Sequence, residues 1–440
     1  MIHVVPGNRQ SENNEITGHN YKNNRRITSH MQLTLLGGAS EVGSLSAYLE
    51  EKGVRLLFDC GLTPSKPPKY PMKPPAVDLA FLSHAHIDHS GMIPWLCANY
   101  GMDVVATPPS IIVGTMLLED SVKVSSLEGF PAPYDKGDVR VLKKHFQNAA
   151  FGDILDIGGM NVVLHPAGHI PGAAMFEVQS DRNMLFTGDI NTLDSHLVNG
   201  AKPVKCDVLV IESTYSGRDH PPRAETERHF LNKTREVVER GGLAIVPAFA
   251  VGRTQEMMMT LMNSGVDIIL DGMGWAVNRH YMSMPKYLRS PERLREAMAQ
   301  TKVIRNPGDR KKLAHTATAV ITTSGMVDGG PVLEFISERK NDKKSAVLLT
   351  GYQVEGTNGR MLMDTGELIL SGQKVKIDCE LGFYDFSAHA DHNELIKFIK
   401  NCAPEEVILC HGDNRIVLAN DLRDEGFKVH MPKEGQTIEF

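Results

Sequence analysis

A cluster of potential metal ligands constrains this chain more than any other feature. His84, His86, Asp88 and His89 occupy four of six consecutive positions and follow the apolar run 77–82. Zinc and its chemical neighbours prefer imidazole and carboxylate ligands. Two histidines spaced two residues apart at a strand end can converge on one ion, and the following Asp-His pair then faces a second ion. A solvated polar turn is the alternative, but the complete His-x-His-x-Asp-His pattern after a strand favours a metal site.

Further candidate ligands lie where apolar, strand-like runs give way to turns that contain glycine. They are Asp59, His169, Asp189 and His411. Functional side chains of α/β folds are placed at such strand ends. Taken singly, each aspartate could cap a turn and each histidine could be a hydrogen-bonded core residue. Their joint occurrence in this order indicates a two-metal hydrolase.

The order of these residues resembles that of a known superfamily. Asp59, the run 84–89, His169 and Asp189 resemble the successive metal motifs of the metallo-β-lactamase fold. The resemblance covers about residues 31–440. It implies an α/β protein built as an αββα sandwich, in which helices cover two stacked sheets.

Three later residues narrow the resemblance to the β-CASP subgroup, whose members process nucleic acids. They are Glu212 in Ile-Glu-Ser-Thr, His389 in Phe-Ser-Ala-His-Ala-Asp and His411 in Leu-Cys-His-Gly-Asp. The run His-Ala-His-Ile-Asp-His-Ser-Gly is more similar to the endonuclease subunit of the cleavage and polyadenylation specificity factor, and to its archaeal relatives, than to the bacterial ribonuclease J branch.

By this resemblance the chain would hold two Zn²⁺ ions. The expected ligands are His84, His86 and His169 for the first ion and Asp88, His89 and His411 for the second, with Asp189 bridging both. Asp59 is expected to orient a ligand, because a carboxylate hydrogen-bonded to a metal-bound imidazole fixes its tautomer and basicity. Two such cations lower the pKa of a water and stabilise charge on a phosphate under in-line attack.

The leaving oxygen of a phosphodiester needs a proton, and we expect His389 to supply it. Glu212 would hold this imidazole in position and raise its pKa toward the working range. Asp88 is counted with these two as catalytic, in addition to being a ligand. The alternative is that Glu212 caps the following segment and that His389 is structural.

The pattern of apolar and polar residues along the chain predicts its domains. Residues 1–30 are polar and aperiodic, which predicts a flexible N-terminal extension. Short apolar strands dominate residues 31–212, whereas helices alternate with strands over residues 213–385, which predicts a parallel sheet. Candidate ligands return in residues 386–440. We therefore expect a metallo-β-lactamase domain in two parts, interrupted by an inserted α/β β-CASP domain.

The inserted segment contains four candidate RNA contacts, which are Arg253, Ser324, Gly325 and Tyr352. Arg253 opens a predicted helix and resembles a phosphate-contacting arginine of the subgroup, although an ordinary salt-bridged residue explains it equally well. Ser324 and the backbone N–H groups around Gly325 follow a strand, where a phosphate could bind; a plain strand-to-helix turn is the alternative. Tyr352 could stack on a base or only pack.

Charge and composition exclude several other classes of protein. The formal net charge of −6 argues against a wholly basic nucleic-acid binder but allows a local basic groove. No apolar stretch reaches the roughly 18 residues of a membrane helix, and residues 1–30 lack the apolar centre of a secretion signal. We expect a cytoplasmic protein with no membrane partner. The six cysteines form no Cys-x-x-Cys pair, which argues against a zinc finger or a disulfide framework.

These features predict a zinc-dependent ribonuclease that hydrolyses single-stranded RNA in RNA processing or decay. Endonucleolytic cleavage is favoured, and 5′-to-3′ exonucleolytic degradation is the alternative, because the same metal core supports both. A small-molecule metallohydrolase would not need the insertion, and an inactive scaffold subunit would have lost ligands. The sequence leaves open whether the chain forms a homodimer or joins a processing or decay complex.

Overall fold

The structure, a computed structural model, describes residues 3–5, 30–130 and 132–440. The chain divides into two compact units: unit 1 comprises Met1–Asp194, Gly200–Asp219 and His389–Phe440, and unit 2 comprises Ser195–Asn199 and His220–Ala388. The chain crosses between them at residues 220 and 388, close to the predicted limits of the insertion at 213 and 385. Among the described residues, no helix has the length and apolar character needed to span a bilayer.

One sheet of unit 1 has seven strands. Their order is β23 (Thr437–Glu439), β2 (Gln32–Gly37), β3 (Ser46–Glu51), β4 (Val54–Phe58), β5 (Leu79–Phe81), β6 (Val104–Ala106) and β7 (Phe146–Asn148). Strands β23 to β4 pair antiparallel, and β4 to β7 pair parallel. The parallel half places the carboxyl ends of β4 and β5 side by side.

The second sheet of unit 1 has eight strands. Their order is β1 (His3–Val5), β8 (Ile154–Ile157), β9 (Met160–Pro166), β10 (Ala174–Gln179), β11 (Met184–Phe186), β12 (Val208–Glu212), β21 (Glu406–Cys410) and β22 (Lys428–His430). Strand β21 comes from the last part of the chain and pairs parallel with β12, so residues on both sides of the insertion build one sheet.

Strand β1 differs from the flexible extension predicted over residues 1–30. His3–Val5 pair antiparallel with β8, which would otherwise be an edge strand with open backbone groups. Three residues are too few for an alternating pattern to show in the sequence. The rest of the predicted extension, residues 1–2 and 6–29, lies outside the described residues.

The core of unit 1 follows from side-chain alternation along its strands. Leu56 and Phe58 face the other sheet, whereas Leu57 between them faces the helices. The ring of Phe58 stacks at 5.3 Å on Phe81 of the same sheet and at 5.2 Å on Phe186 of the opposite sheet. The space between the sheets is therefore filled by packed aromatic and aliphatic side chains.

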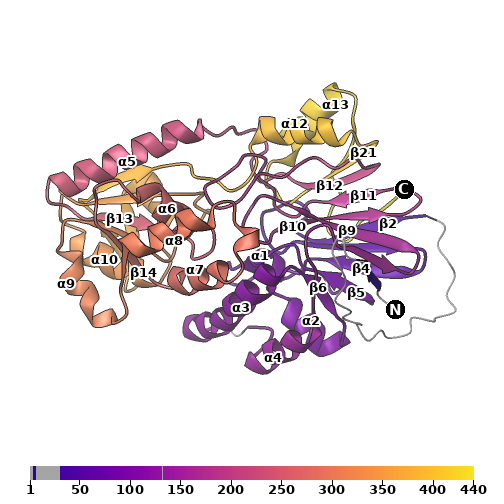
Figure 1. The fold of residues 1–440 in the computed structure, drawn as a ribbon, viewed down its shortest axis with the longest axis horizontal. Coiled ribbons are helices and arrows are strands. Elements are labelled where there is room, and N and C mark those ends of the chain that lie inside the picture. Colours follow the sequence, from indigo (N-terminus) through magenta and orange to yellow (C-terminus); the bar gives the residue numbers. More distant parts are fainter. Residues whose placement is uncertain (1–2, 6–29, 131) are drawn as a thin grey trace. The chain divides into compact units, whose positions relative to one another are not determined.

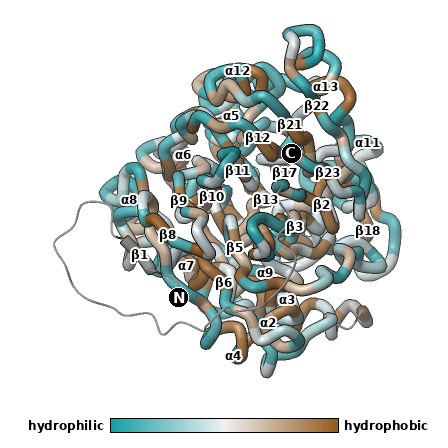
Figure 2. Tube along the Cα trace, turned by 90° about the vertical axis from the view of Figure 1, so that its right-hand side faces the viewer, coloured by the Kyte–Doolittle hydropathy of each residue, from teal (hydrophilic) through white to brown (hydrophobic). Residues whose placement is uncertain are grey.

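Helices cover both outer faces of unit 1. Helices α2 (Ile93–Tyr100), α3 (Pro108–Glu128) and α4 (Lys136–His145) lie on the seven-stranded sheet, and α12 (His392–Cys402) and α13 (Arg415–Asp424) lie on the other sheet (Figure 1). Hydrophobic and hydrophilic stretches alternate along α12, as expected for a helix that buries one face (Figure 2). The predicted αββα sandwich is confirmed.

Unit 2 contains a six-stranded sheet in which every pairing is parallel. The strand order is β15 (Thr301–Val303), β14 (Ile268–Asp271), β16 (Ala319–Thr322), β13 (Ala244–Pro247), β17 (Ala346–Leu349) and β20 (Glu380–Phe383). The alternation of helix and strand predicted such a sheet, and that prediction is confirmed. The carboxyl ends of the neighbouring strands β16, β13 and β17 consequently lie at one edge.

The helices of unit 2 connect these parallel strands. They are α5 (Arg223–Glu239), α6 (Arg253–Leu261), α7 (Gly274–Met282), α8 (Pro291–Gln300), α9 (Arg310–Ala314), α10 (Pro331–Arg339) and α11 (Asn358–Thr365). A small hairpin of β18 (Glu367–Leu370) and β19 (Gln373–Lys376) follows α11.

A short segment of unit 2 comes from an unexpected part of the sequence. Residues Ser195–Asn199 lie within the predicted first part of the metallo-β-lactamase domain but pack in unit 2. The backbone N–H of Leu197 donates to the carboxylate of Glu256 at 2.7 Å, and its carbonyl accepts from the N–H of Arg289 at 2.8 Å. Nothing in the local sequence predicts these long-range hydrogen bonds.

Candidate metal centre

The candidate ligands of unit 1 follow strands of both sheets. Asp59 follows β4 and His411 follows β21, and both take left-handed backbone conformations, with φ of 58° and 49°. Aspartate and histidine tolerate this region better than most residues, but it still costs about 1 to 3 kcal/mol. Gly61 lets the backbone approach the ligand run, since an added Cβ would lie 1.6 Å from the carbonyl oxygen of Asp88. The fold thus stores local strain where it aims these side chains.

The first ligand group gathers His84, His86, His169 and Asp189, whose donor atoms all lie within 4.8 Å of one another. The Nδ1 atom of His86 lies 3.0 Å from Nε2 of His84 and 3.1 Å from Nε2 of His169. Oδ2 of Asp189 lies 3.6 and 3.7 Å from those two Nε2 atoms. Tetrahedral ligands of zinc sit about 3.3 Å apart at the usual bond lengths. The spacing of this group fits such an ion.

The second group gathers Asp88, His89 and His411 around the other oxygen of Asp189. Oδ1 of Asp189 lies 3.2 Å from Nε2 of His89 and 3.6 Å from Nε2 of His411. Oδ2 of Asp88 lies 4.0 and 3.7 Å from the same two nitrogens. Helix α1 (Ile87–Ser90) carries both Asp88 and His89. Asp189 therefore presents one oxygen to each group.

Unsatisfied polar atoms at this point fit a cation site. Nε2 of His89, Nε2 of His411 and Oδ1 of Asp189 are buried and make no hydrogen bond within the described structure. Buried polar atoms without partners are rare in folded proteins, since each costs its full desolvation energy. Three such atoms that face one another are what a divalent cation would satisfy.

The charges of the cluster lead to the same conclusion. Burial lowers the pKa of His84 well below its ordinary value, and the neighbouring His89 lowers it further. Burial acts likewise on His89, but the carboxylates of Asp189 and Asp59 outweigh it and raise its pKa well above the ordinary value. Burial raises the pKa of Asp189, but His89 and His411 outweigh this effect and hold it well below the usual range. The buried carboxylate of Asp189 thus attracts positive charge at this point, and a bound cation would supply it.

Asp59 lies behind the ligands and not among them. Its Oδ2 accepts from Nδ1 of His89 at 2.8 Å and from the hydroxyl of Ser83 at 2.7 Å, and its Oδ1 accepts from the N–H of Ser83 at 2.6 Å. The hydroxyl of Ser83 also lies 3.0 Å from Nδ1 of His84. Asp59 and Ser83 thus orient imidazoles of both groups. The sequence analysis missed Ser83, although its position directly before His84 was a usable signal.

His389 and Glu212 form a separate pair beside Asp189. Nδ1 of His389 lies 2.9 and 3.0 Å from the two carboxylate oxygens of Glu212, and its Nε2 lies 3.9 Å from Oδ2 of Asp189. Burial lowers the pKa of His389, but Glu212 and Asp189 outweigh this effect and raise the pKa to about 9. Glu212 also accepts from the N–H of Ile190 at 2.6 Å and from the hydroxyl of Thr214, a contact the sequence analysis missed. His389 is therefore held by one nitrogen while the other faces the cluster.

The four candidate RNA contacts all lie in unit 2, at the carboxyl edge of β16, β13 and β17. Arg253 begins α6 and donates to the carbonyl of Thr350, directly after β17. Tyr352 lies two residues further along and is partly exposed. This edge is where open parallel sheets bind ligands.

Ser324 and Gly325 follow β16 at the same edge. Oγ of Ser324 is buried and has no hydrogen-bond partner in the described structure. The carbonyl of Gly325 accepts from the side chain of Gln353 at 3.2 Å, and an added Cβ at Gly325 would meet Phe249 at 3.0 Å. The structure thus brings the four candidates to one edge of the sheet. Two of them, Arg253 and Gly325, already contact neighbouring protein groups there.

Comparison with known proteins covers nearly the whole described chain. The metallo-beta-lactamase superfamily matches residues 40–231, the Beta-Casp domain matches residues 254–362, and the Zn-dependent metallo-hydrolase RNA specificity domain matches residues 374–432. These three matches follow the order of the predicted segments.

Individual relatives extend over both units. The chain is 35% identical to Probable RNase MJ4 of Methanocaldococcus jannaschii, over 93% of this chain and 100% of that protein. It is 29% identical to cleavage and polyadenylation specificity factor 73 of Drosophila melanogaster, over 87% of this chain and 60% of that protein. A solved protein of unknown function from Enterococcus faecalis V583 shares the fold with a TM-score of 0.61 at 13% identity, over 93% of this chain and 100% of that one.

Proposed function

The chain belongs to the β-CASP branch of the metallo-β-lactamase superfamily, and we propose that it is a zinc-dependent ribonuclease that cuts single-stranded RNA internally. The match to an RNA specificity domain and the relatives described above support RNA as the substrate. The likeness to a cleavage factor supports internal cutting. RNA processing or decay is the corresponding cellular role.

One observation carries the proposal, namely the position of Asp189 between two groups of ligands. Its Oδ2 faces His84 and His169, and its Oδ1 faces His89 and His411. Two bound cations would lower the pKa of an attacking water and neutralise charge that develops on the phosphate. We assign His84, His86 and His169 to the first Zn²⁺, Asp88, His89 and His411 to the second, and Asp189 to both.

His389 is assigned the transfer of a proton to the leaving oxygen. Its Nδ1 donates to Glu212, which fixes the ring and leaves Nε2 directed toward the cluster. A positioned general acid contributes roughly 10²- to 10⁴-fold to such a reaction. Glu212 is a positioning residue, because it acts through the imidazole.

We propose that unit 2 binds phosphates of the RNA other than the phosphate that is cleaved. Arg253, Ser324, Gly325 and Tyr352 share the carboxyl edge of its parallel sheet, where backbone N–H groups and helix N-termini favour anions. A contact of this kind binds ground state and transition state equally, so its loss raises KM more than it lowers kcat.

Circular RNA provides the decisive test of internal cutting. The purified chain is loaded with zinc and incubated with a circular RNA and with linear RNAs that carry a 5′ monophosphate or a 5′ triphosphate. We expect the circle to be opened and both linear RNAs to be cut at similar rates. Mononucleotide release that requires a 5′ monophosphate, with an intact circle, would instead establish a 5′-to-3′ exonuclease.

A further inference from the structure

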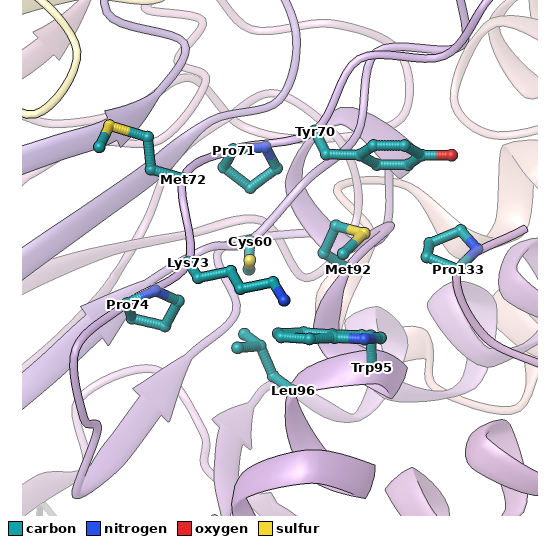
Figure 3. Close-up of a pocket in the computed structure, with 10 residues that line it drawn as sticks. All are labelled: Cys60, Tyr70, Pro71, Met72, Lys73, Pro74, Met92, Trp95, Leu96 and Pro133. Carbon is teal, nitrogen blue, oxygen red and sulfur yellow. The ribbon is translucent and has the colours of Figure 1, made fainter.

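Unit 1 contains an apolar pocket that the metal centre does not use. Its volume is about 190 Å³, and its walls include Tyr70, Pro71, Lys73, Trp95 and Pro133 (Figure 3). The ammonium group of Lys73 lies 5.1 Å from the centroid of the Trp95 ring. Tyr70 is 43% exposed, so its side chain is accessible to a ligand. The volume lies below the roughly 300 to 1,000 Å³ of drug-sized sites, so it suits one ring system.

The segment that forms one wall is rigid and basic. Residues 60–77 contain six prolines and three lysines and no acidic residue. Proline fixes the backbone φ angle, so this wall keeps its shape with little loss of entropy on binding. One of the lysines, Lys69, forms an ion pair with Glu41 at 2.5 Å, whereas Lys73 reaches over the pocket. The wall therefore favours a ligand that combines a flat apolar ring with negative charge.

We propose that this pocket binds one unpaired base of the RNA substrate, with Trp95 and Tyr70 contacting the base and Lys73 the adjoining phosphate. The inference rests on the proposed ribonuclease function, because it names a second contact of the same substrate. Aromatic rings combined with basic side chains are the usual platform for single-stranded nucleic acid, since every base has a π face. A neutral apolar ligand would gain nothing from the positive charge of Lys73.

The present position of Lys73 is compatible with this role. An exposed cation–π contact is weaker than the stacking of a base on an aromatic ring. A base can therefore displace the ammonium group from the face of Trp95, and the flexible lysine remains close enough to pair with the phosphate that arrives with the base.

Backbone hydrogen bonds connect the pocket to the metal centre within unit 1. Cys60, at the pocket floor, donates its N–H to the carbonyl of His89 at 2.9 Å, and its carbonyl accepts from the N–H of Met92 at 2.7 Å. Asp59, whose carboxylate orients the imidazole of His89, precedes Cys60 directly. A base in the pocket would thus be held in a fixed position relative to the metal ligands, which would set how far from that base the strand is cut.

The binding half of the proposal can be tested through Trp95 itself. The chain has two tryptophans, so Trp275→Phe leaves Trp95 as the only one. The zinc-chelated variant is titrated with an oligouridylate, with an abasic oligomer of equal charge and with a proline-rich peptide. We expect saturable quenching of Trp95 emission by the oligouridylate and little by the abasic oligomer. Equal quenching by both oligomers, or quenching by the peptide alone, would overturn the proposal.

A paired kinetic experiment separates binding from structural effects. The double variant Tyr70→Ala with Lys73→Met should raise KM for RNA about tenfold, and Lys428→Met, an exposed lysine of the same unit, serves as the charge control. Hydrolysis of a small phosphodiester, which reaches only the metal centre, should stay unchanged. An unchanged KM for RNA would refute the pocket while leaving the ribonuclease intact. If the native protein neither binds nor cuts RNA, the proposed function itself fails.

Discussion

The two units differ in how their candidate functional residues are satisfied. In unit 1, buried donor atoms of His89, His411 and Asp189 converge without hydrogen-bond partners. In unit 2, Arg253 already donates to a backbone carbonyl and the carbonyl of Gly325 accepts from a neighbouring side chain, while the hydroxyl of Ser324 is a single buried group without a partner in the described structure. Three unsatisfied buried atoms that face one another are what a bound cation would satisfy, whereas one buried hydroxyl beside groups that already have partners does not form such a site. This contrast supports our proposal that unit 1 carries the catalytic centre and that unit 2 contributes to RNA binding.

The largest effect should come from Asp189→Ala. Removing the carboxylate that faces both ligand groups should abolish RNA cleavage, well beyond the roughly 10- to 100-fold loss typical of residues that only support a ligand. Bound zinc and cleavage are measured on the same samples, with Asp181→Ala, an exposed aspartate of unit 1, as the control. If Asp189→Ala cleaves RNA near the native rate, this cluster is not the catalytic centre.

A smaller loss is expected from His389→Ala. Without the proton donor, cleavage should fall by about 10²- to 10⁴-fold while zinc content stays native. Glu212→Gln should have a milder effect, since the imidazole remains but loses its charged partner. His430→Ala removes a histidine of the same unit that pairs with Glu406 and serves as the control. Loss of zinc in step with activity would make His389 a ligand instead.

Asp59→Asn tests whether the carboxylate that is hydrogen-bonded to His89 supports zinc binding. The change removes the charge that supports the imidazole of His89 but keeps the volume of the side chain. Zinc affinity should fall by roughly 10- to 100-fold, and saturating zinc should restore most of the cleavage. Competition with a chelator of known affinity measures the first effect. A variant that binds zinc normally and remains inactive would show that Asp59 takes part in the reaction directly.

The smallest effect belongs to unit 2. Arg253→Ala should raise KM for RNA more than it lowers kcat and should flatten the dependence of RNA affinity on salt, because one fewer phosphate is neutralised. A small phosphodiester should be hydrolysed at the native rate. Arg360→Ala, an exposed arginine of unit 2 paired with Asp364, controls for a simple loss of charge. An equal loss of activity on RNA and on the small phosphodiester would contradict a role of Arg253 in RNA binding alone.

The metal centre could be predicted only partly from local sequence, because its ligands come from distant parts of the chain. The short spacing of His84 to His89 marked the first part of the site, whereas the resemblance to a known family implied that His169, Asp189 and His411 join it; the structure gathers all of these residues. The sandwich and the parallel sheet follow from the same periodicities. Ser83 and Thr214 were missed because their roles depend on which partner lies opposite, and hydroxyl residues are too common to signal this.

Long-range features escaped prediction for a physical reason. The segment Ser195–Asn199 joins unit 2 through hydrogen bonds to residues about 60 and 90 positions away, such as Glu256 and Arg289. The pocket beside Trp95 likewise depends on how a proline-rich loop packs against α2. Neither feature leaves a periodic pattern along the chain. The residues of unit 2 proposed to contact RNA also gave only weak signals, because arginine, serine and tyrosine serve many roles.

A zinc titration tests the central claim most directly. The chain is stripped of metal and zinc is added stepwise, while bound zinc and RNA cleavage are measured on the same samples. The arrangement of ligands around Asp189 predicts two zinc ions per chain, with cleavage emerging as the second ion binds. Full cleavage with a single bound zinc, or the same activity without any, would contradict it.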